Sequence, residues 1–240
     1  MKRFCVLVGL LGALGTAAMA STLCVNDNSL QSYITNYNTF GNACQINDKV
    51  FWGFSLTPGP SASGTEPAAS QIQVQTNLFD GFSNVGIVFN TGGWITSAGA
   101  VLDDIISYHV ATISGFAAIK DATLTITGTL TGNGGSGNVT ETLTPAQLGS
   151  PIGTAVPNPV SVNILFGAPV NALAVSTEIK VVGGVGPLDF AHISIVENDF
   201  SEIVPEPFGF LLTGSGLVLL GLASRRRLGK SSVVVVGGKQ

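Results

Sequence analysis

The sequence predicts an all-β fold, an antiparallel and jelly-roll-like β-sandwich with one short N-terminal helix and a C-terminal transmembrane helix. Apolar and polar residues alternate at period two in roughly eight or nine short segments, which Gly, Pro and Asn turns separate. The segments between these strands lack helical patterns, which excludes the crossover connections of a parallel α/β sheet. The chain has no repeat of fixed period, so neither a solenoid nor a propeller is expected.

The start of the chain has the three parts of a secretory signal peptide. Residues 1–3 are positively charged, residues 4–15 are apolar, and Ala18 and Ala20 form a small-x-small cleavage site. We therefore expect the Sec translocon to export the chain and signal peptidase to remove residues 1–20.

Two cysteines, Cys24 and Cys44, remain in the predicted mature chain. An exported protein folds in an oxidising compartment, so a disulfide between them is expected. Closing this loop contributes about 3 kcal/mol in the chain-entropy model. A metal-binding pair is the alternative, but it lacks a neighbouring His or second Cys pair.

The exported domain, residues 21–204, is predicted to begin with a helix and a strand. Residues 28–38 have apolar side chains at helical spacing, with Asn28 as a possible cap. The segment that follows Cys44 has period-two spacing, which predicts that Trp52 shares the core face of its strand. Residues 57–70 form a Pro-, Gly- and Ser-rich loop. The side chains behind these predictions are Leu30, Tyr33, Ile34 and Tyr37 for the helix, and Val50, Trp52, Phe54 and Leu56 for the strand.

Later strands follow at short intervals. The clearest one alternates Ala122, Leu124 and Ile126 with threonines, as expected of a half-buried strand. The other predicted strands cover residues 72–76, 85–89, 106–110, 139–143, 160–166, 173–182 and 190–196.

The charge distribution excludes two classes of partner. The whole chain has a net charge of −4, but residues 21–204 hold three Lys against 13 Asp and Glu, a net charge of −10. Such a domain repels nucleic acids and anionic lipid surfaces.

Candidate sites for chemistry are few. His109 and His192 occupy polar faces of strand patterns, and a secreted hydrolase would need one of them beside an Asp and a nucleophile. The chain has no GxSxG motif, so no enzyme activity is predicted. No cofactor is expected other than calcium, for which Asp103 and Asp104 are candidates, with residues 197–199 as a second acidic segment. β-Sandwiches often bind glycans through exposed aromatic side chains, and Trp52 and Trp94 are the candidates. Trp52 is expected in the core, whereas Trp94, after a Gly-Gly turn, is less constrained and is the candidate for an exposed position.

The end of the chain has three parts in a fixed order. Pro205, Glu206 and Pro207 precede an uncharged apolar segment, residues 208–224, which three arginines follow. As a helix this segment would be roughly 26 Å long, just short of a hydrocarbon core of about 30 Å. The arginines place its C-terminal end in the cytoplasm and the exported domain outside. The arginines are Arg225, Arg226 and Arg227.

This order of motif, apolar helix and arginines resembles the PEP-CTERM sorting signal of Gram-negative bacteria. The resemblance implies that residues 205–227 hold the exported chain briefly in the inner membrane and that an exosortase then processes it at the PEP motif. Residues 228–240 lie beyond this signal and have no assigned role.

The exported domain is similar to a group of uncharacterised exported proteins that carry the same signal. The similar segments are LQSYI, GNACQINDKVFWGFSL, GIVFNTGGWITSAGAVLDDIISYHV and DATLTITG, which carry packing and turn residues. The resemblance implies a β-sandwich and no particular activity.

The sequence as a whole predicts a structural or interaction protein of the cell envelope or extracellular matrix. We expect it at the cell surface, with exopolysaccharide as a partner. The alternatives are a glycan- or calcium-binding surface module and, less favoured, a secreted hydrolase.

Overall fold

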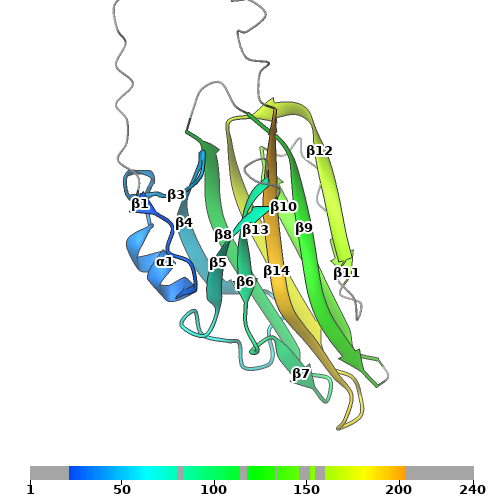
Figure 1. Ribbon diagram of the computed structural model, residues 1–240. Coiled ribbons are helices and arrows are strands. Elements are labelled where there is room, and N and C mark those ends of the chain that lie inside the picture. Colours follow the sequence, from blue (N-terminus) through cyan, green and yellow to red (C-terminus); the bar gives the residue numbers. More distant parts are fainter. Residues whose placement is uncertain are drawn as a thin grey trace, which may run out of the picture. The chain divides into compact units, whose positions relative to one another are not determined.

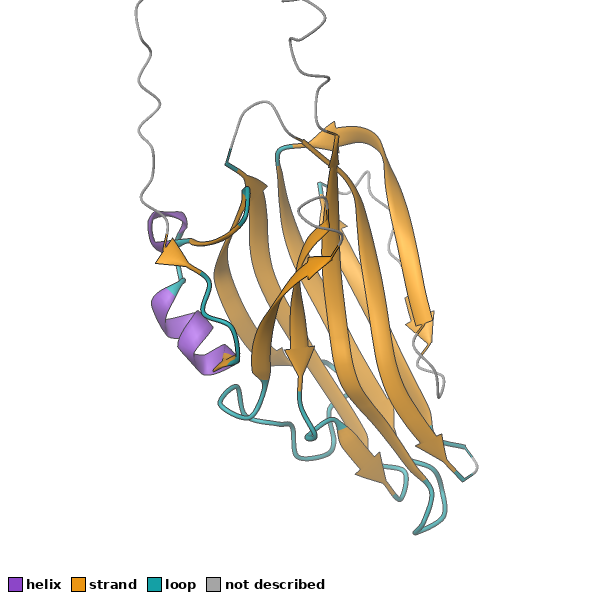
Figure 2. Cartoon of the chain, in the orientation of Figure 1, coloured by secondary structure: helices purple, strands orange, loops and turns teal. Residues whose placement is uncertain are grey.

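The computed structural model describes residues 22–79, 84–113, 118–132, 134–145, 152–154 and 160–203. These residues form two sheets and one short α-helix (Figures 1 and 2), which confirms the predicted β-sandwich and its N-terminal helix. The chain divides into two compact units, Met1–Glu202 and Ile203–Gln240, and the sandwich belongs to the first. No helix within the described ranges has the length and hydropathy to cross a membrane. The predicted transmembrane segment, residues 208–224, lies outside these ranges.

The two sheets, A and B, are antiparallel except where β1 and β3 pair in parallel. Both contain strands from early and late parts of the chain. In spatial order, sheet A consists of β1 (Thr22–Leu23), β3 (Cys44–Ile46), β4 (Lys49–Pro58), β8 (Val101–Thr112), β13 (Ala172–Val182), β10 (Ser136–Thr144) and β11 (Ile152–Thr154). Sheet B consists of β12 (Val160–Val170), β9 (Ala118–Thr131), β14 (Phe190–Ile203), β6 (Asn84–Asn90), β5 (Gln73–Phe79) and β2 (Asn28–Ser29), and β7 (Ile95–Ser97) pairs with β14.

The core lies between the inward faces of the two sheets. On β9, Ala122, Leu124 and Ile126 are buried while the threonines between them are partly exposed, as the alternation predicts. Sheet A contributes inward residues such as Ile106, Val175, Ile179 and Val139, and sheet B contributes Ile87, Phe89, Val196 and Phe200.

Strand β4 departs from the predicted pattern at Gly53. Its register with β8 shifts between Trp52 and Ser55, and Gly53 has a φ of 70°. An extra residue in a strand reverses the face of every residue beyond it. Phe54 therefore points into the core, whereas Trp52 lies on the outer face of sheet A. The prediction that Trp52 shares the core face with Phe54 is wrong for this reason.

Helix α1 (Leu30–Asn36) packs against β4, and it is shorter than the predicted 28–38. Ser29, not Asn28, caps it by accepting a hydrogen bond from the backbone N–H of Ser32 at 3.3 Å. Tyr33 is buried against the edge of Phe54, with ring centroids 5.1 Å apart.

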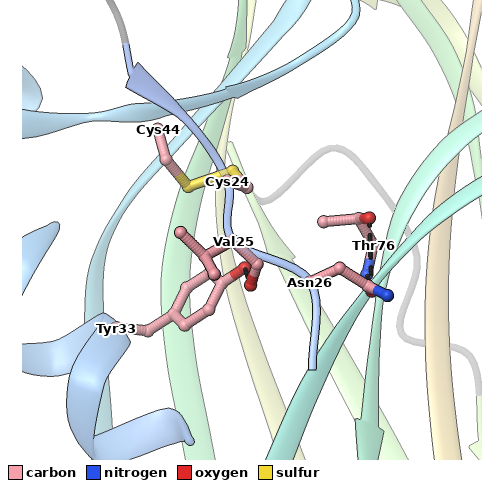
Figure 3. Close-up of a disulfide and its surroundings, with 6 residues drawn as sticks. All are labelled: Cys24, Val25, Asn26, Tyr33, Cys44 and Thr76. Atoms are coloured by element: carbon pink, nitrogen blue, oxygen red, sulfur yellow. Dashed lines mark hydrogen bonds between the residues drawn. A yellow bond between two sulfur atoms is a disulfide. The ribbon is translucent and has the colours of Figure 1, made fainter. Parts of the chain in front are cut away.

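The predicted disulfide between Cys24 and Cys44 is present (Figure 3). It joins the segment before α1 to β3, the strand that precedes β4. The Tyr33 hydroxyl donates to the carbonyl of Val25 at 2.8 Å, next to the bridge. Asn26 accepts a hydrogen bond from the backbone N–H of Thr76 in β5. The disulfide and these two bonds fix the N-terminal segment to both sheets.

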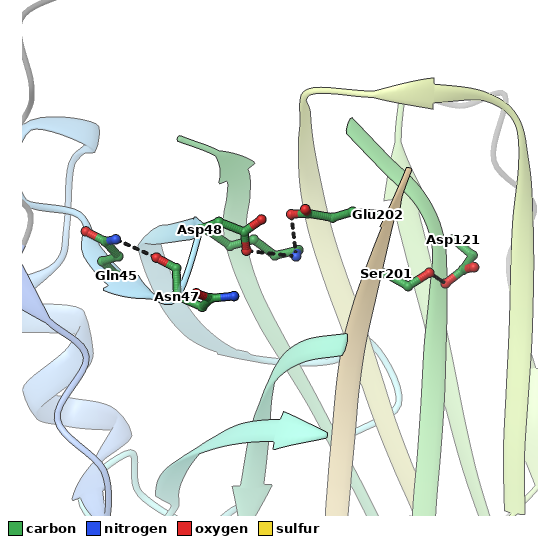
Figure 4. A network of polar contacts seen from close by, with 7 residues as sticks. Gln45, Asn47, Asp48, Asp121, Ser201 and Glu202 are labelled. Carbon is green, nitrogen blue, oxygen red and sulfur yellow. Dashed lines mark hydrogen bonds and ion pairs between the residues drawn. The ribbon is translucent and has the colours of Figure 1, made fainter. Parts of the chain in front are cut away.

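A buried ion pair connects the two sheets where β4 begins and β14 ends. Lys49 is fully buried, and its Nζ lies 2.6 Å from Glu202 Oε1 and 3.4 Å from Asp48 Oδ1. Nearby, the Ser201 hydroxyl donates to the carboxylate of Asp121 (Figure 4). These contacts join the end of β14 to the start of β4 and to β9.

Candidate functional site

Three rings from separate segments meet on the outer face of sheet A. Trp52 of β4 and His109 of β8 are direct cross-strand partners, and their rings stack with centroids 5.2 Å apart and planes 20° from parallel. Phe40, in the 3₁₀ turn Phe40–Asn42, meets Trp52 edge-on at 4.8 Å. Phe40 is 46% exposed and His109 is exposed as well. We call these three residues the aromatic cluster.

The bulge at Gly53 makes this cluster possible. The Gly53 N–H donates to the carbonyl of Tyr37 at 2.7 Å, which ties the bulge to the end of α1. A Cβ at this position would lie 2.8 Å from Cδ2 of His109, so only glycine leaves room for the ring. Beneath Trp52, Val50 forms a small apolar cluster with two alanines that is separate from the main core.

A row of hydroxyl groups crosses sheet A next to the aromatic cluster. Four residues on four adjacent strands lie directly opposite one another in register. Two of them are joined, because Ser107 Oγ donates to Ser176 Oγ at 3.3 Å. All four residues are at least partly exposed, and a hydroxyl that makes one hydrogen bond can still accept another from a ligand. We call Ser55, Ser107, Ser176 and Thr142 the hydroxyl row.

Trp52 and His109 belong to a second row of residues that face each other across sheet A, and the next residue of this row, on β13, is small. Across β8 and β13, His109 lies opposite Ala174, whose methyl group does not rise beside the imidazole. One side of the aromatic cluster is therefore bordered by small side chains and hydroxyls. An exposed ring beside hydroxyl groups suits a ligand with both C–H faces and hydroxyl groups.

Trp94 lies in the core, so the prediction that it is exposed is wrong. Its exposed fraction is 0%, and its indole N–H donates to Asp104 Oδ2 at 2.8 Å inside the sandwich. The pKa of Asp104 is raised to about 6, mainly by burial. The hydrogen bond from Trp94 opposes this rise, and the charges of Glu66 and Asp103 add to it. The indole is buried there because the inward-facing carboxyl group provides its N–H with an acceptor.

The two calcium candidates point to opposite sides of β8. Asp104 faces inward, to Trp94, whereas Asp103 Oδ2 accepts from the backbone N–H of Ser61 in the loop over the outer face. That loop also brings Glu66 close, since its Oε1 accepts from the Asp103 backbone N–H at 3.0 Å. Sequence reasoning missed Glu66 because 37 residues separate it from Asp103. Within the described ranges, no group of three or more His, Cys, Asp or Glu side chains is arranged to hold a metal ion.

The second acidic segment lies on sheet B. Asn198 faces the core, while Asn77 of β5 donates to the carboxylates of both Glu197 and Asp199. Burial and then the charge of Glu197 raise the pKa of Asp199 to about 7. This arrangement satisfies the two acids with an amide from a neighbouring strand.

The two histidines lie in different sheets. His109 belongs to the aromatic cluster on sheet A, and His192 lies on β14 of sheet B, opposite Ile95. The hydrolase alternative therefore has no shared site built from this pair, and the absence of enzyme activity stays a prediction. Several predicted residues lie outside the described ranges and stay predictions, namely Ala18, Ala20, Pro205, Glu206, Pro207, Arg225, Arg226 and Arg227.

Comparisons with known proteins give no family. No family model matches the chain, and no curated protein matches it. Among solved structures, the complex of TmCBM61 with β-1,4-galactotriose is 10% identical, covers 63% of this chain and 88% of its own, and has a TM-score of 0.31. The CBM36-1 domain of a xylanase from the hindgut metagenome of Trinervitermes trinervoides is 14% identical over 60% of this chain and 95% of its own, with a TM-score of 0.22.

A family 29 carbohydrate-binding module is 8% identical over 61% of this chain and 88% of its own, with a TM-score of 0.18. At these TM-scores and identities, no conclusion about the function of this chain follows from the likeness.

Proposed function

We propose that this chain is an exported surface protein whose sandwich binds neutral glycans through the aromatic cluster on sheet A. The observation that carries the proposal is the exposed grouping of Phe40, Trp52 and His109 from three separate segments. Exposed apolar groups that cluster on a soluble domain mark interaction sites more often than chance surface residues do. The main core contains neither Trp52 nor His109, and Trp52 packs on the small outer cluster with Val50, which leaves it partly exposed.

The aromatic cluster and the hydroxyl row together suit a sugar ligand. The C–H face of a pyranose ring packs on an aromatic ring through dispersion and hydrophobic contact. Along β8, the hydroxyl row lies two residues from His109, about 7 Å away along the strand. A sugar on the aromatic cluster can therefore reach the hydroxyls of Ser107 and Ser176 with its own hydroxyl groups.

The negative charge of the domain favours neutral glycans over anionic ones. With a net charge of −10 over residues 21–204, the domain repels uronic acids and sulfated sugars at low ionic strength. The residues of the two rows carry no carboxylate. We therefore assign the site to neutral oligosaccharides.

Binding to a glycan array, followed by titration of the best neutral ligand, tests this proposal. Trp52→Ala and His109→Ala should each weaken binding at least tenfold, and the control Leu188→Ala, which shortens another exposed apolar side chain, should not. β-1,4-Galactotriose, the ligand in one of the similar structures, is one of the probes. Each variant is melted first to show that it is folded. Equal binding by all variants, or none by the parent chain, would overturn the proposal.

The terminal residues support the proposed route to the surface. In this proposal, Sec exports the chain, residues 208–224 hold it in the inner membrane with the arginines in the cytoplasm, and an exosortase processes it at Pro205, Glu206 and Pro207. Its destination would be the cell surface or an exopolysaccharide matrix. Expression with and without an exosortase tests the route, and an unchanged mature mass and anchoring in both strains would contradict it.

Calcium binding is a second candidate function, favoured by one observation on the loop side of β8. Asp103 Oδ1 and Glu66 Oε2 are both buried and have no hydrogen-bond partner, and buried oxygens of this kind suit a cation. This proposal replaces Asp104 with Glu66 as the companion of Asp103. Millimolar calcium should raise the melting temperature of the parent chain and leave that of Asp103→Asn unchanged. An equal response in both proteins would remove the proposal.

A further inference from the structure

The four edges of the two sheets differ in length. Sheet A ends in β1, with two residues, and in β11, with three. Sheet B ends in β2, with two residues, and in β12, with 11. A short edge exposes few unpaired backbone groups, whereas a long one is a template for another strand. Among the described strands, β12 is the long edge.

Strand β12 has little of the protection that long edges usually carry. Charged side chains, prolines and bulges are the common means of blocking an edge. Val160–Val170 contains no charged residue. Pro169 and a register shift after Leu165 block the far end, so the regular part is residues 160–165, roughly 20 Å long. Leu165 is 73% exposed there.

We propose that residues 160–165 of β12 form an interface with a second copy of this chain, the two strands pairing antiparallel about a two-fold axis. Such an axis, perpendicular to the sheet, joins the two B sheets and keeps both cores on the same side. Each copy then satisfies the outward backbone groups of the other.

A second copy fits this edge better than it fits other parts of the surface. The domain has a net charge of −10, so two copies repel each other except where an uncharged strip lets them approach. Ser161 and Asn163 are exposed, and each already makes one side-chain hydrogen bond to a threonine of β9. A hydroxyl and an amide have further donors and acceptors, so these side chains can also bond to their own copies across the axis. The nearest acid on β9, Asp121, lies one strand in and accepts a hydrogen bond from Ser201.

This pairing is independent of the proposed glycan site, which lies on the outer face of the other sheet. A dimer through β12 would leave both copies of the aromatic cluster accessible. If both proposals hold, one dimer would hold two sugars and bind a polymeric glycan with an avidity that one copy lacks.

Single cysteines test the pairing in the full chain in detergent. The chain also contains Cys5, so a Cys5→Ser chain is the baseline, with Cys24 and Cys44 already paired. The single substitutions Ser161→Cys, Val162→Cys, Asn163→Cys, Ile164→Cys and Leu165→Cys are made in that baseline and oxidised separately, because only the residue at the two-fold axis faces its own copy. Residues that face each other across an antiparallel pair have Cα atoms about 4.5–5.5 Å apart, a distance that suits a disulfide. At least one variant should run as a covalent dimer. Thr125→Cys, on the same face of β9 opposite Ser161, is the matched control and should stay monomeric.

Analytical ultracentrifugation measures the same contact at equilibrium. Asn163→Lys places like charges across the axis and should weaken dimerisation at least tenfold, whereas Thr125→Lys should leave it unchanged. A monomeric parent chain would overturn the proposal. Equal cross-linking in the control, or cross-linking to a different protein instead of a second copy, would overturn it as well.

Discussion

Trp52 and His109 lie directly opposite each other on β4 and β8, and their stacked rings stand outside the main core of the sandwich. The second tryptophan of the chain, Trp94, is fully buried and bonded to Asp104. The two indoles therefore differ in their access to solvent and in what each can do. Trp52 is available to a ligand, whereas Trp94 holds an inward carboxyl group in place.

Fluorescence quenching should separate the two tryptophans. Trp94→Phe leaves Trp52 as the emitter, and Trp52→Phe leaves Trp94. We expect acrylamide, which is uncharged, to quench Trp52 several-fold more strongly because only its ring is in contact with water. Ligand addition should change the emission of Trp52 and leave that of Trp94 unchanged. Equal quenching constants would show that the outer position of Trp52 is wrong.

Gly53→Ala should damage both the fold and the site. Its φ of 70° is unfavourable for any residue with a Cβ, and that Cβ would press on His109. We expect a loss of roughly 1–3 kcal/mol in the free energy of unfolding, measured by urea titration. Glycan binding should weaken as well, because the imidazole must move away from Trp52.

Gly92→Ala is the matched control for this substitution. A Cβ at Gly92 meets no atom within 4 Å, so its effect should stay within about 0.5 kcal/mol. Similar losses at the two glycines would contradict the role of the bulge.

The sequence predicted the sandwich well because alternation at period two is a local property. Segments such as 122–126 have the same pattern whichever strands they pair with, so their inward faces could be assigned in advance. The helix and the disulfide were predicted for similar reasons, from local spacing and from the compartment.

The aromatic cluster could not be predicted because it depends on pairings between distant segments. Trp52 reaches the outer face only because Gly53 bulges towards Tyr37, and it meets His109 only through the register of β4 and β8. A glycine within an otherwise apolar strand does indicate a bulge, so Gly53 was the one local clue. Glu66 had no comparable clue, since a loop brings it to Asp103.

Glu141 gives the sandwich a pH dependence. It is fully buried on β10 opposite Thr177 of β13, and neither of its carboxyl oxygens has a hydrogen-bond partner. Asn198 of the facing sheet donates to Thr177 and to the hydroxyl of Tyr108 in the same region. Burial, and then the charge of Asp199, raises the pKa of Glu141 from 4.5 to about 8. The folded chain therefore keeps a proton on Glu141 at neutral pH.

Because the pKa of Glu141 is higher in the folded chain, its contribution to the free energy of unfolding falls as the pH rises. Below pH 4.5 both the folded and the unfolded chain hold the proton, and from 4.5 to about 8 only the folded chain does. Glu141 therefore lowers the free energy of unfolding by at most about 1.4 kcal/mol per pH unit across this window. Glu141→Gln should be more stable than the parent chain at pH 8, with a smaller difference at pH 4.5.

Urea titrations across this pH range measure the effect. Glu178→Gln, which removes a partly exposed carboxylate from β13 in the same sheet, is the matched control for the substitution. A constant offset between Glu141→Gln and the parent chain would contradict the titration of Glu141.

The ion pair between Lys49 and Glu202 should determine how far the chain can be truncated from its C-terminus without loss of stability. Both side chains are buried, and Glu202 is the last residue of the compact unit that holds the sandwich. A fragment of residues 21–204 should therefore melt cooperatively without the C-terminal segment. A fragment of residues 21–201 loses the carboxylate and leaves Lys49 with Asp48 alone, which should reduce stability by roughly 3 kcal/mol.

A second substitution separates the lost charge pair from the lost chain end. Lys49→Met in the 21–201 fragment removes the unpaired buried charge and should recover most of the stability. In the 21–204 fragment the same substitution should instead reduce stability, because it leaves the buried carboxylate of Glu202 without its cation. If Lys49→Met leaves the shorter fragment as unstable as before, the backbone of β14 and not the ion pair closes this end of the sandwich.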